Sequence, residues 1–377
     1  MVIKSIKVSL RNVDNSKKKI FFPGDTIEGI CEVEVGSNDG IFNCATAEPT
    51  NATVEITLRG TSKVQWTETR TVVISSGKTT TTMVYTDTFS SVRPIVDLKK
   101  TLTVPNEHQG FHQKLFSFTL PEKGLKTSFE GAHGSIKYEI EAKPPANWLS
   151  SLFKPKDALE INVMEDVNVD SRSKRRPTGG QAEKTVCCLF LKSAPVVLEA
   201  DINHQGFCPG DPIVVNAEML NGSSRKVKPY VRLVQKTSFI ANGGRTKVQS
   251  KTFNLASRKD VGWDNILVKG QQHQISSVEF KTPFVPPSIK AGNIIVSYQI
   301  EIGLAIPWAT TINVPLKVTI GSFRKDDFES DSLPLEYGEH FFNRSNSDSG
   351  IEDNVSISSS TSRTKMKKSG RKNGKIS

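Results

Sequence analysis

The chain is poor in cysteine and aromatic residues, and it has no long uninterrupted apolar run. Its 377 residues include 5 cysteines and 7% aromatic residues. An odd cysteine count, with Cys187 and Cys188 adjacent, does not suit a disulfide framework. The most charge-poor region, residues 291–316, is broken by Glu301 and alternates in polarity, which predicts two strands and not a membrane span. The first residues alternate too and do not resemble a secretory leader. We therefore expect a soluble, reduced, cytoplasmic protein.

Helical periodicity is also missing. Short runs of alternating apolar and polar residues, separated by glycine, proline and asparagine, recur along the chain and predict strands. The clearest are residues 3–10, 52–58, 115–120, 136–142, 159–163, 196–202, 212–220, 230–237, 278–280, 294–302 and 312–320. This spacing is typical of all-β proteins built from β-sandwiches.

Catalytic motifs are lacking as well. Gly77-Lys78-Thr79 ends like a phosphate-binding loop, but Val72 stands where such a loop needs its first glycine. His108 and His112 flank Gly110 in a region without helical pattern, which does not favour a metal site. No nucleophile and base, or pair of carboxylates, stands out. We expect a non-enzymatic protein without cofactor or metal, and without the interleaved aromatic and basic residues that bind nucleic acid.

Two stretches of the chain repeat each other. Phe22-Pro23-Gly24-Asp25 opens one alternating run and Cys208-Pro209-Gly210-Asp211 opens another. Tyr-x-Ile-Glu begins at Tyr138 and again at Tyr298, each followed by a tryptophan, Trp148 or Trp308, expected to pack near a strand end. Landmarks in the same order predict a duplicated domain. A tandem of similar β domains without an active site is typical of a binding scaffold.

Composition sets the predicted boundaries. A first domain spans residues 1–167, a polar, turn-rich linker spans 168–184, a second domain spans 185–322, and residues 323–377 form a tail. The tail has an acidic stretch, then a serine-rich stretch, then a basic stretch, with few apolar residues throughout. Such a segment cannot bury enough surface to offset its ordering entropy, so we expect it to be disordered.

The tail contains two candidate interaction segments. The first is Pro334-Leu335-Glu336-Tyr337, whose proline and tyrosine suit an aromatic-lined groove such as that of a WW domain. The second is basic and is either a solvated end, a contact for anionic lipid or nucleic acid, or an import signal. Its basic residues are Lys365, Lys367, Lys368, Arg371, Lys372 and Lys375.

Several ordered motifs together resemble the α-arrestins, the arrestin domain-containing proteins. They include the two Pro-Gly-Asp turns, the Cys187-Cys188 pair and Pro286-Pro287-Ser288-Ile289. Longer matching stretches are Phe116-Ser117-Phe118-Thr119-Leu120-Pro121, Ser128 to Tyr138 and Pro315 to Gly321. The resemblance covers about residues 3–321. It implies two arrestin-type, immunoglobulin-like β-sandwiches in tandem and no catalytic activity.

The resemblance also implies partners. Members of this family look like adaptors that bind membrane receptors or transporters for endocytosis or sorting. They act at the plasma membrane or endosomes and recruit WW-bearing HECT ubiquitin ligases through Pro-Pro-x-Tyr. This chain departs from that motif, because Leu335 stands where the second proline is needed. The alternative is a signalling regulator or coat-like scaffold that binds receptors without recruiting a ligase.

Overall fold

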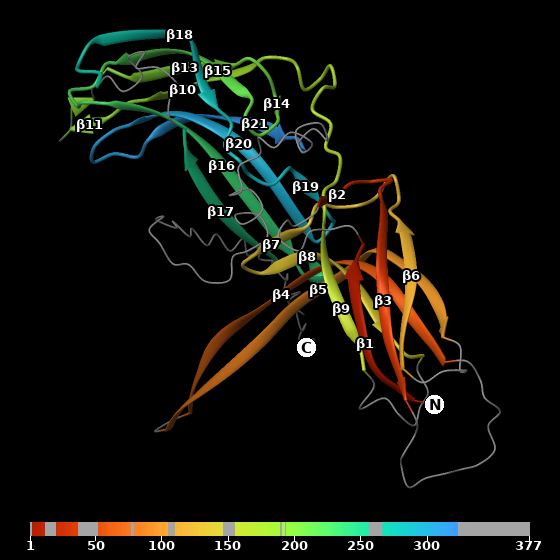
Figure 1. Ribbon diagram of the computed structural model, residues 1–377. Helices are drawn as coiled ribbons and strands as arrows, with labels where there is room; N and C mark the ends of the chain where they lie inside the picture. Colours follow the sequence, from red (N-terminus) through yellow and green to blue (C-terminus); the bar gives the residue numbers. More distant parts are fainter. Residues whose placement is uncertain are drawn as a thin grey trace, which may run out of the picture.

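The structure is a computed structural model, and almost everything it describes is β-sheet. Two sheet-rich halves lie end to end and meet near the middle of the molecule (Figure 1). Within the described residues there is one short 3₁₀ turn, η1 (Asn242–Gly244), and no α-helix. The all-β prediction is therefore confirmed. The described residues are 2–11, 20–36, 52–76, 79–104, 110–145, 155–188, 191–192, 194–255 and 266–322.

The first domain pairs a small sheet with a larger one. The small sheet has the order β1-β3-β6, made of β1 (Val2–Leu10), β3 (Thr26–Gly36) and β6 (Gly110–Thr119). In the larger sheet, of order β2-β9-β8-β4-β5, β7 also pairs with β8. Its strands are β2 (Ile20–Phe21), β4 (Ala52–Ser76), β5 (Thr79–Val104), β7 (Phe129–Gly131), β8 (Gly134–Lys143) and β9 (Asp157–Val163). Alternate residues of β3, including Ile27, Cys31 and Val33, are buried in the core between the sheets, as alternation predicts.

The second domain repeats this plan. One sheet has the order β10-β13-β15-β18 and the other β14-β21-β20-β16-β17, with β19 pairing β20. The first contains β10 (Thr178–Lys184), β13 (Val196–Ile202), β15 (Pro212–Asn221) and β18 (Gln271–Lys281). The other contains β14 (Gly206–Phe207), β16 (Lys228–Ile240), β17 (Thr246–Asn254), β19 (Ile289–Lys290), β20 (Ile294–Ala305) and β21 (Ile312–Ile320). A short pair, β11 (Cys187–Cys188) and β12 (Leu191–Lys192), stands apart.

The duplication extends to individual hydrogen bonds. In the first Pro-Gly-Asp turn the Asp25 carboxylate accepts the amide N–H of Phe22 at 2.8 Å. In the second turn the Asp211 carboxylate accepts the N–H of Cys208 at 2.7 Å. The intervening glycines both adopt positive φ, 83° at Gly24 and 91° at Gly210. Residues that have a Cβ atom rarely adopt positive φ. The need for glycine at this position of the turn explains why the motif recurs.

The paired tyrosines are equivalent as well. The Tyr138 hydroxyl donates to the carbonyl of Lys126 at 2.6 Å, and the Tyr298 hydroxyl donates to the carbonyl of Pro286 at 2.6 Å. Burial raises the pKa of both phenols, so each stays protonated and keeps donating. Each tyrosine thus fastens an irregular segment onto the larger sheet of its domain.

Two features differ from the sequence-based expectations. Thr178–Lys184, assigned to the linker, forms β10 and pairs with β13, so this part of the chain belongs to a sheet of the second domain. Trp308 does not pack, because 97% of its surface is exposed in the turn between β20 and β21. A strand-end tryptophan packs only where a neighbouring element covers it, and strand alternation carries no signal for that cover. Trp148 lies outside the described residues.

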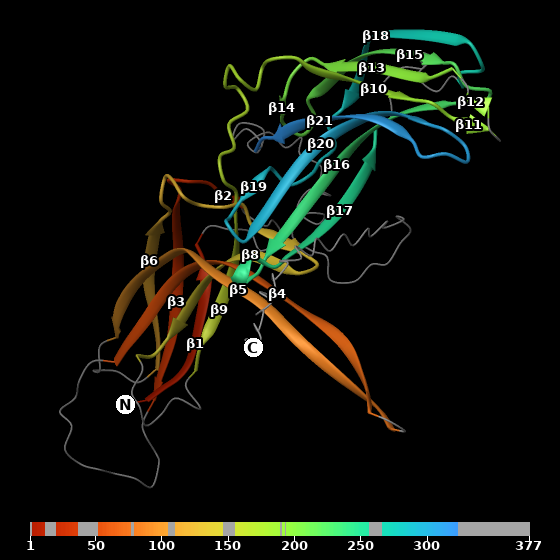
Figure 2. The ribbon, with the colours of Figure 1, turned by 180° about the vertical axis from the view of Figure 1, so that it is seen from behind.

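The hairpin of β4 and β5 projects from the body of the molecule (Figure 2). β8 pairs with β4 only as far as Val64, whereas β4 and β5 remain paired to Ser76 and Thr79. Residues 65–76 and 79–90 therefore form a two-stranded extension, called the projecting ribbon here. In the second domain the corresponding strands are much shorter, since β16 ends at Ile240 and β17 starts at Thr246.

Candidate functional surface at the domain junction

The tail motifs predicted from sequence lie outside the described residues. Both Pro334-Leu335-Glu336-Tyr337 and the basic residues from Lys365 to Lys375 fall in the segment that follows Ser322. They stay predictions. The surface that the structure does describe is built where the two domains meet.

An asparagine of the second domain is hydrogen-bonded to two strands of the first. The Asn293 side chain is fully buried and accepts the Ser62 hydroxyl at 2.6 Å. Its amide donates to the carbonyl of Ser62 at 3.0 Å and to that of Ser91 at 3.3 Å. Ser62 and Ser91 lie on β4 and β5 at the base of the projecting ribbon. A buried amide with these bonds satisfied fixes the domains relative to each other.

An aromatic and charged cluster surrounds this contact. Trp66 stacks on Phe89 with 5.5 Å between the ring centroids, and both belong to the ribbon's base. From β17, the Lys247 ammonium lies 5.8 Å from the centroid of the Trp66 ring. The Glu68 carboxylate pairs with Lys247 at 3.7 Å and with Arg245 at 3.8 Å. These pairs join the domains through cation–π contacts and opposite charges.

His133 occupies the same cluster. Its ring contacts Phe239 edge-on at 5.5 Å, across the junction, and lies 6.2 Å from the Trp66 ring. Burial, and then the positive charge of Lys247, lower the pKa of His133 below its ordinary value. The neutral imidazole is therefore the form that suits the junction. The sequence offered only its flanking glycines as a signal.

A cleft of about 550 Å³ lies between the domains beside this cluster. The first domain contributes β7 and its neighbours, including Phe129 and Glu130, and the second contributes β16, β17 and the segment at Val285. Its lining mixes aromatic rings with amides and hydroxyls. The β17 residues on this side are Gln249, Lys251 and Phe253. Among the described residues β17 pairs only with β16, so its other edge is unpaired next to the cleft.

The hairpin of β16 and β17 is basic throughout. No aspartate or glutamate occurs between Met219 and Leu255. In that interval the basic residues are Arg225, Lys226, Lys228, Arg232, Lys236, Arg245, Lys247 and Lys251. Glu301 of the neighbouring β20 pairs with Arg232 at 2.7 Å, whereas Lys236 reaches only the neutral Gln299, at 3.3 Å. The hairpin therefore keeps excess positive charge.

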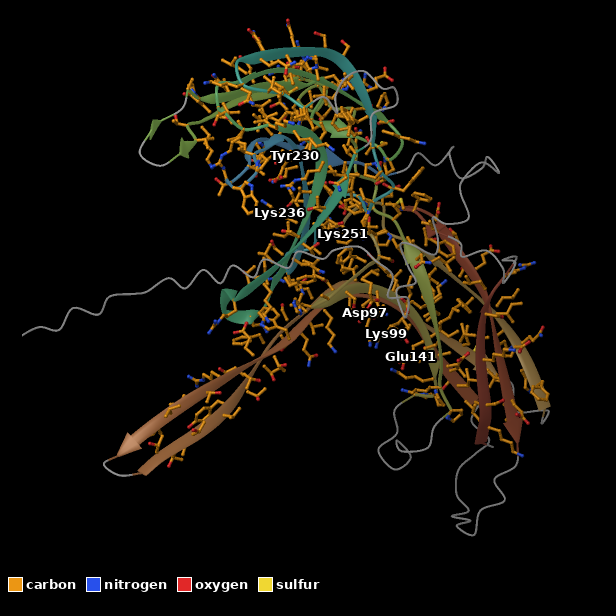
Figure 3. The ribbon with its side chains drawn as sticks, turned by 90° about the vertical axis from the view of Figure 1, so that its left-hand side faces the viewer. Asp97, Lys99, Glu141, Tyr230, Lys236 and Lys251 are labelled. Atoms are coloured by element: carbon orange, nitrogen blue, oxygen red, sulfur yellow. The ribbon has the colours of Figure 1, made fainter. Side chains whose placement is uncertain are left out.

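The facing sheet of the first domain is charged but balanced. Figure 3 labels Asp97, Lys99 and Glu141 on the first domain and Tyr230, Lys236 and Lys251 on the second. Lys99 pairs with Glu55 at 3.5 Å, and Glu141 pairs with Lys143 at 2.8 Å, which lowers the pKa of Glu141. Opposite charges so close together cancel at a distance. The excess of basic over acidic residues at the junction lies in the second domain, in the interval between Met219 and Leu255.

Reactive chemistry does not gather in the described part of the chain. No group of three or more histidine, cysteine or acidic residues there has the geometry to hold a metal ion. Cys31 is buried, and burial with nearby carboxylates raises the pKa of its thiol to about 11, which makes it a poor nucleophile. No helix among these residues has the length and apolar character needed to cross a bilayer.

Comparison with known proteins gives these domains a family. A model of the arrestin (or S-antigen) N-terminal domain matches residues 11–169, and one of the C-terminal domain matches residues 192–324. The chain belongs to the arrestin family. Human arrestin domain-containing protein 4 is 31% identical over 59% of this chain and 51% of its own length. Thioredoxin-interacting protein is 30% identical over 55% of this chain, covering 50% of the rat protein and 51% of the human one.

These relatives confirm the expected α-arrestin resemblance. The chain spans about half the length of the curated relatives it matches. The tandem β-sandwich expectation is also confirmed, since both arrestin domain models match in order and the two domains share their strand order apart from the additional β10 of the second.

Proposed function

We propose that this arrestin-family chain is a non-enzymatic adaptor for membrane receptors or transporters, acting in endocytosis or sorting. It works in the cytoplasm, peripherally at the plasma membrane or endosomes. The observation that supports this best is the basic β16–β17 hairpin beside an interdomain cleft. A cytoplasmic segment of a membrane protein is exposed as an extended chain, and acidic segments are attracted to this surface.

The unpaired edge of β17 gives the contact its geometry. An extended peptide adds to a free strand edge through main-chain hydrogen bonds, and its alternate side chains then face one side. On β17, Lys247 and Lys251 project to the same side because they lie an even number of residues apart. Acidic residues at alternate positions of a bound segment would face them. The proposed cargo signal is thus an extended, alternating acidic stretch.

Peptide titration tests this contact on the full chain. The probe is a labelled peptide alternating glutamate with valine, and binding is followed by fluorescence anisotropy. Lys251→Glu should weaken binding about tenfold, or about 1.4 kcal/mol. Lys7→Glu makes the same charge change at an exposed position of β1 and serves as the matched control.

A second peptide tests whether the backbone of the bound segment is recognised. A peptide of the same sequence with alternate amide nitrogens methylated cannot donate to β17 and should bind at least about tenfold more weakly. Equal affinity for the methylated peptide, or an equal effect of Lys7→Glu, would overturn strand addition at β17.

Coupling to a HECT ligase is the finer part of the proposal. Pro334 and Tyr337 supply the ring and the phenol for a WW groove. Leu335 supports the second candidate, a signalling regulator or coat-like scaffold that binds receptors without a ligase, because it replaces the proline that the family motif requires. The basic tail from Lys365 to Lys375 is proposed to add contacts to anionic lipid.

A further inference from the structure

The projecting ribbon has no counterpart in the second domain, although the two domains otherwise repeat each other. In register, Tyr138 pairs with Gly60 and its equivalent Tyr298 pairs with Gln235, so Gln65 corresponds to Ile240. β16 ends at that point, while β4 continues to Ser76. The added length extends past the last residue of β8 that supports it, Gly134. The fold of the domain does not require it.

The outer part of the ribbon carries exposed apolar side chains among serines and threonines. Val73 and Val84 are 59% and 64% exposed, and Ile74, Met83 and Tyr85 are exposed too. Cross-strand partners share a face, and Val73 pairs with Thr82 whereas Ile74 pairs with Thr81. Neighbouring positions point to opposite faces. Exposed apolar side chains therefore occur on both faces of the ribbon, next to a tip that consists of serine, glycine, lysine and threonine at residues 75–82.

Charge changes sharply along the ribbon. Its base carries Glu68 and an ion pair between Arg70 and Asp87 at 3.4 Å. Beyond that pair the sequence contains no carboxylate, and Lys78 is its only charged residue. Tyr85, with Arg70 5.2 Å from its ring centroid, lies at the boundary between the two parts. Tyrosine and arginine side chains are typical of the interface between a bilayer and water.

We propose that the outer ribbon inserts into the headgroup region of an anionic lipid bilayer. Lipid surrounds both faces of a ribbon, and both faces carry exposed apolar side chains here. The absence of carboxylates beyond Asp87, and the acid-free β16–β17 hairpin beside the ribbon's base, match a negatively charged surface. Two signals of this kind, apolar and basic, together give stable membrane association.

The depth of insertion is limited by the backbone. Beyond Gln65, whose N–H donates to the carbonyl of His133, the ribbon strands β4 and β5 pair with each other and with no other described strand, so each has an outer edge without a described partner strand. Such groups remain in contact with water or headgroups, because leaving them bare in hydrocarbon is costly. The ribbon therefore lies at the interface and does not span. This inference extends the proposed membrane adaptor and is independent of peptide binding at β17.

Vesicle sedimentation of the full chain tests the proposal. The probe is a vesicle of phosphatidylcholine with phosphatidylserine and no protein. Val73→Asp combined with Val84→Asp should reduce binding at least about tenfold. Val92→Asp, on the same β5 strand at 60% exposure but outside the ribbon, should bind like the unaltered chain. Because all three positions are exposed, the variants should fold equally well, which far-ultraviolet circular dichroism checks.

Fluorescence supplies an independent readout. Val84→Trp should shift its emission to the blue on these vesicles, and lipids brominated near the headgroup should quench it more than lipids brominated near the chain end. Unchanged sedimentation of the double variant, or no blue shift, would overturn the proposal. Binding only to membranes that contain a receptor would also overturn it, in favour of a protein partner. If the unaltered chain binds the vesicles but does not bind the acidic peptide, only the proposed β17 contact is rejected.

Discussion

At the scale of single residues, Asn293 contributes more to the junction than its size suggests. Its side chain meets carbonyls and a hydroxyl of the first domain with no exposed surface. A smaller apolar side chain there leaves Ser62 and Ser91 with buried polar groups that lack a partner. The free energy of unfolding falls mainly because the buried polar groups of Ser62 and Ser91 lose their hydrogen-bond partner, and less because of the bond itself.

Asn293→Ala should lower the free energy of unfolding by about 1–3 kcal/mol. Urea denaturation measures the change, and Asn254→Ala, at an exposed position on β17, is the control. In a double-mutant cycle with Ser62→Ala, the coupling energy should exceed about 0.5 kcal/mol. A change equal to that of Asn254→Ala would show that the junction does not rest on this side chain.

At the scale of elements, corresponding hairpins of the two domains have diverged. β16–β17 is short, basic and next to the cleft, whereas β4–β5 is long and has exposed apolar side chains in its outer part. Both meet at the junction, where Lys247 and Arg245 contact Glu68 at the ribbon's base. One duplicated element thus yields two different surfaces that are held by a shared contact.

The tail segment Pro334-Leu335-Glu336-Tyr337 is an element whose function depends on one position. A second consecutive proline stiffens the extended chain before it binds and adds a ring to the groove. Leu335→Pro in a tail peptide should tighten binding to a HECT-ligase WW domain about tenfold, about 1.4 kcal/mol. Tyr337→Ala should abolish the binding of the unaltered peptide. Isothermal titration decides both, and no gain from Leu335→Pro would favour the scaffold that lacks a ligase.

At the scale of the whole molecule, the two domains are joined through side chains as well as through the chain. The buried apolar residues of both form one continuous cluster. Binding at the cleft or at the ribbon therefore acts on a unit with a defined spacing between its surfaces. That spacing is useful to an adaptor, because two contacts held at a fixed distance reinforce each other.

This junction should weaken in acid. The pKa of His133 is lowered in the folded chain, so the unfolded chain binds its proton more readily, and protonation favours unfolding. Stability should therefore fall as pH drops through and below 6.5, the ordinary histidine value. His133→Gln should lose less stability than the unaltered chain between pH ~7.5 and ~5. His204→Gln, in the turn between β13 and β14, is the control, and identical pH profiles for both variants would contradict the assignment.

Much of the fold is written locally in the sequence. Alternation marks β13 and β21 at their observed bounds, and the Pro-Gly-Asp turns mark the duplication, because side-chain direction and turn dihedrals depend on neighbouring residues. The family resemblance was also readable from ordered motifs. Strand lengths were less readable, since the predicted strand at residues 52–58 continues to Ser76 as a ribbon supported by pairing with β5.

The functional surface was decided by tertiary structure. Ser62 and Asn293 lie 231 positions apart, and no local sequence pattern in either segment predicts their hydrogen bond. The cleft, the half-buried position of His133 and the contact of Glu68 with Lys247 exist only because sheets of the two domains meet. The exposure of Trp308 likewise depends on what covers it. The sequence alone therefore determined the all-β, duplicated, motif-poor character of the chain, while packing between domains determined where its charges and apolar side chains can act.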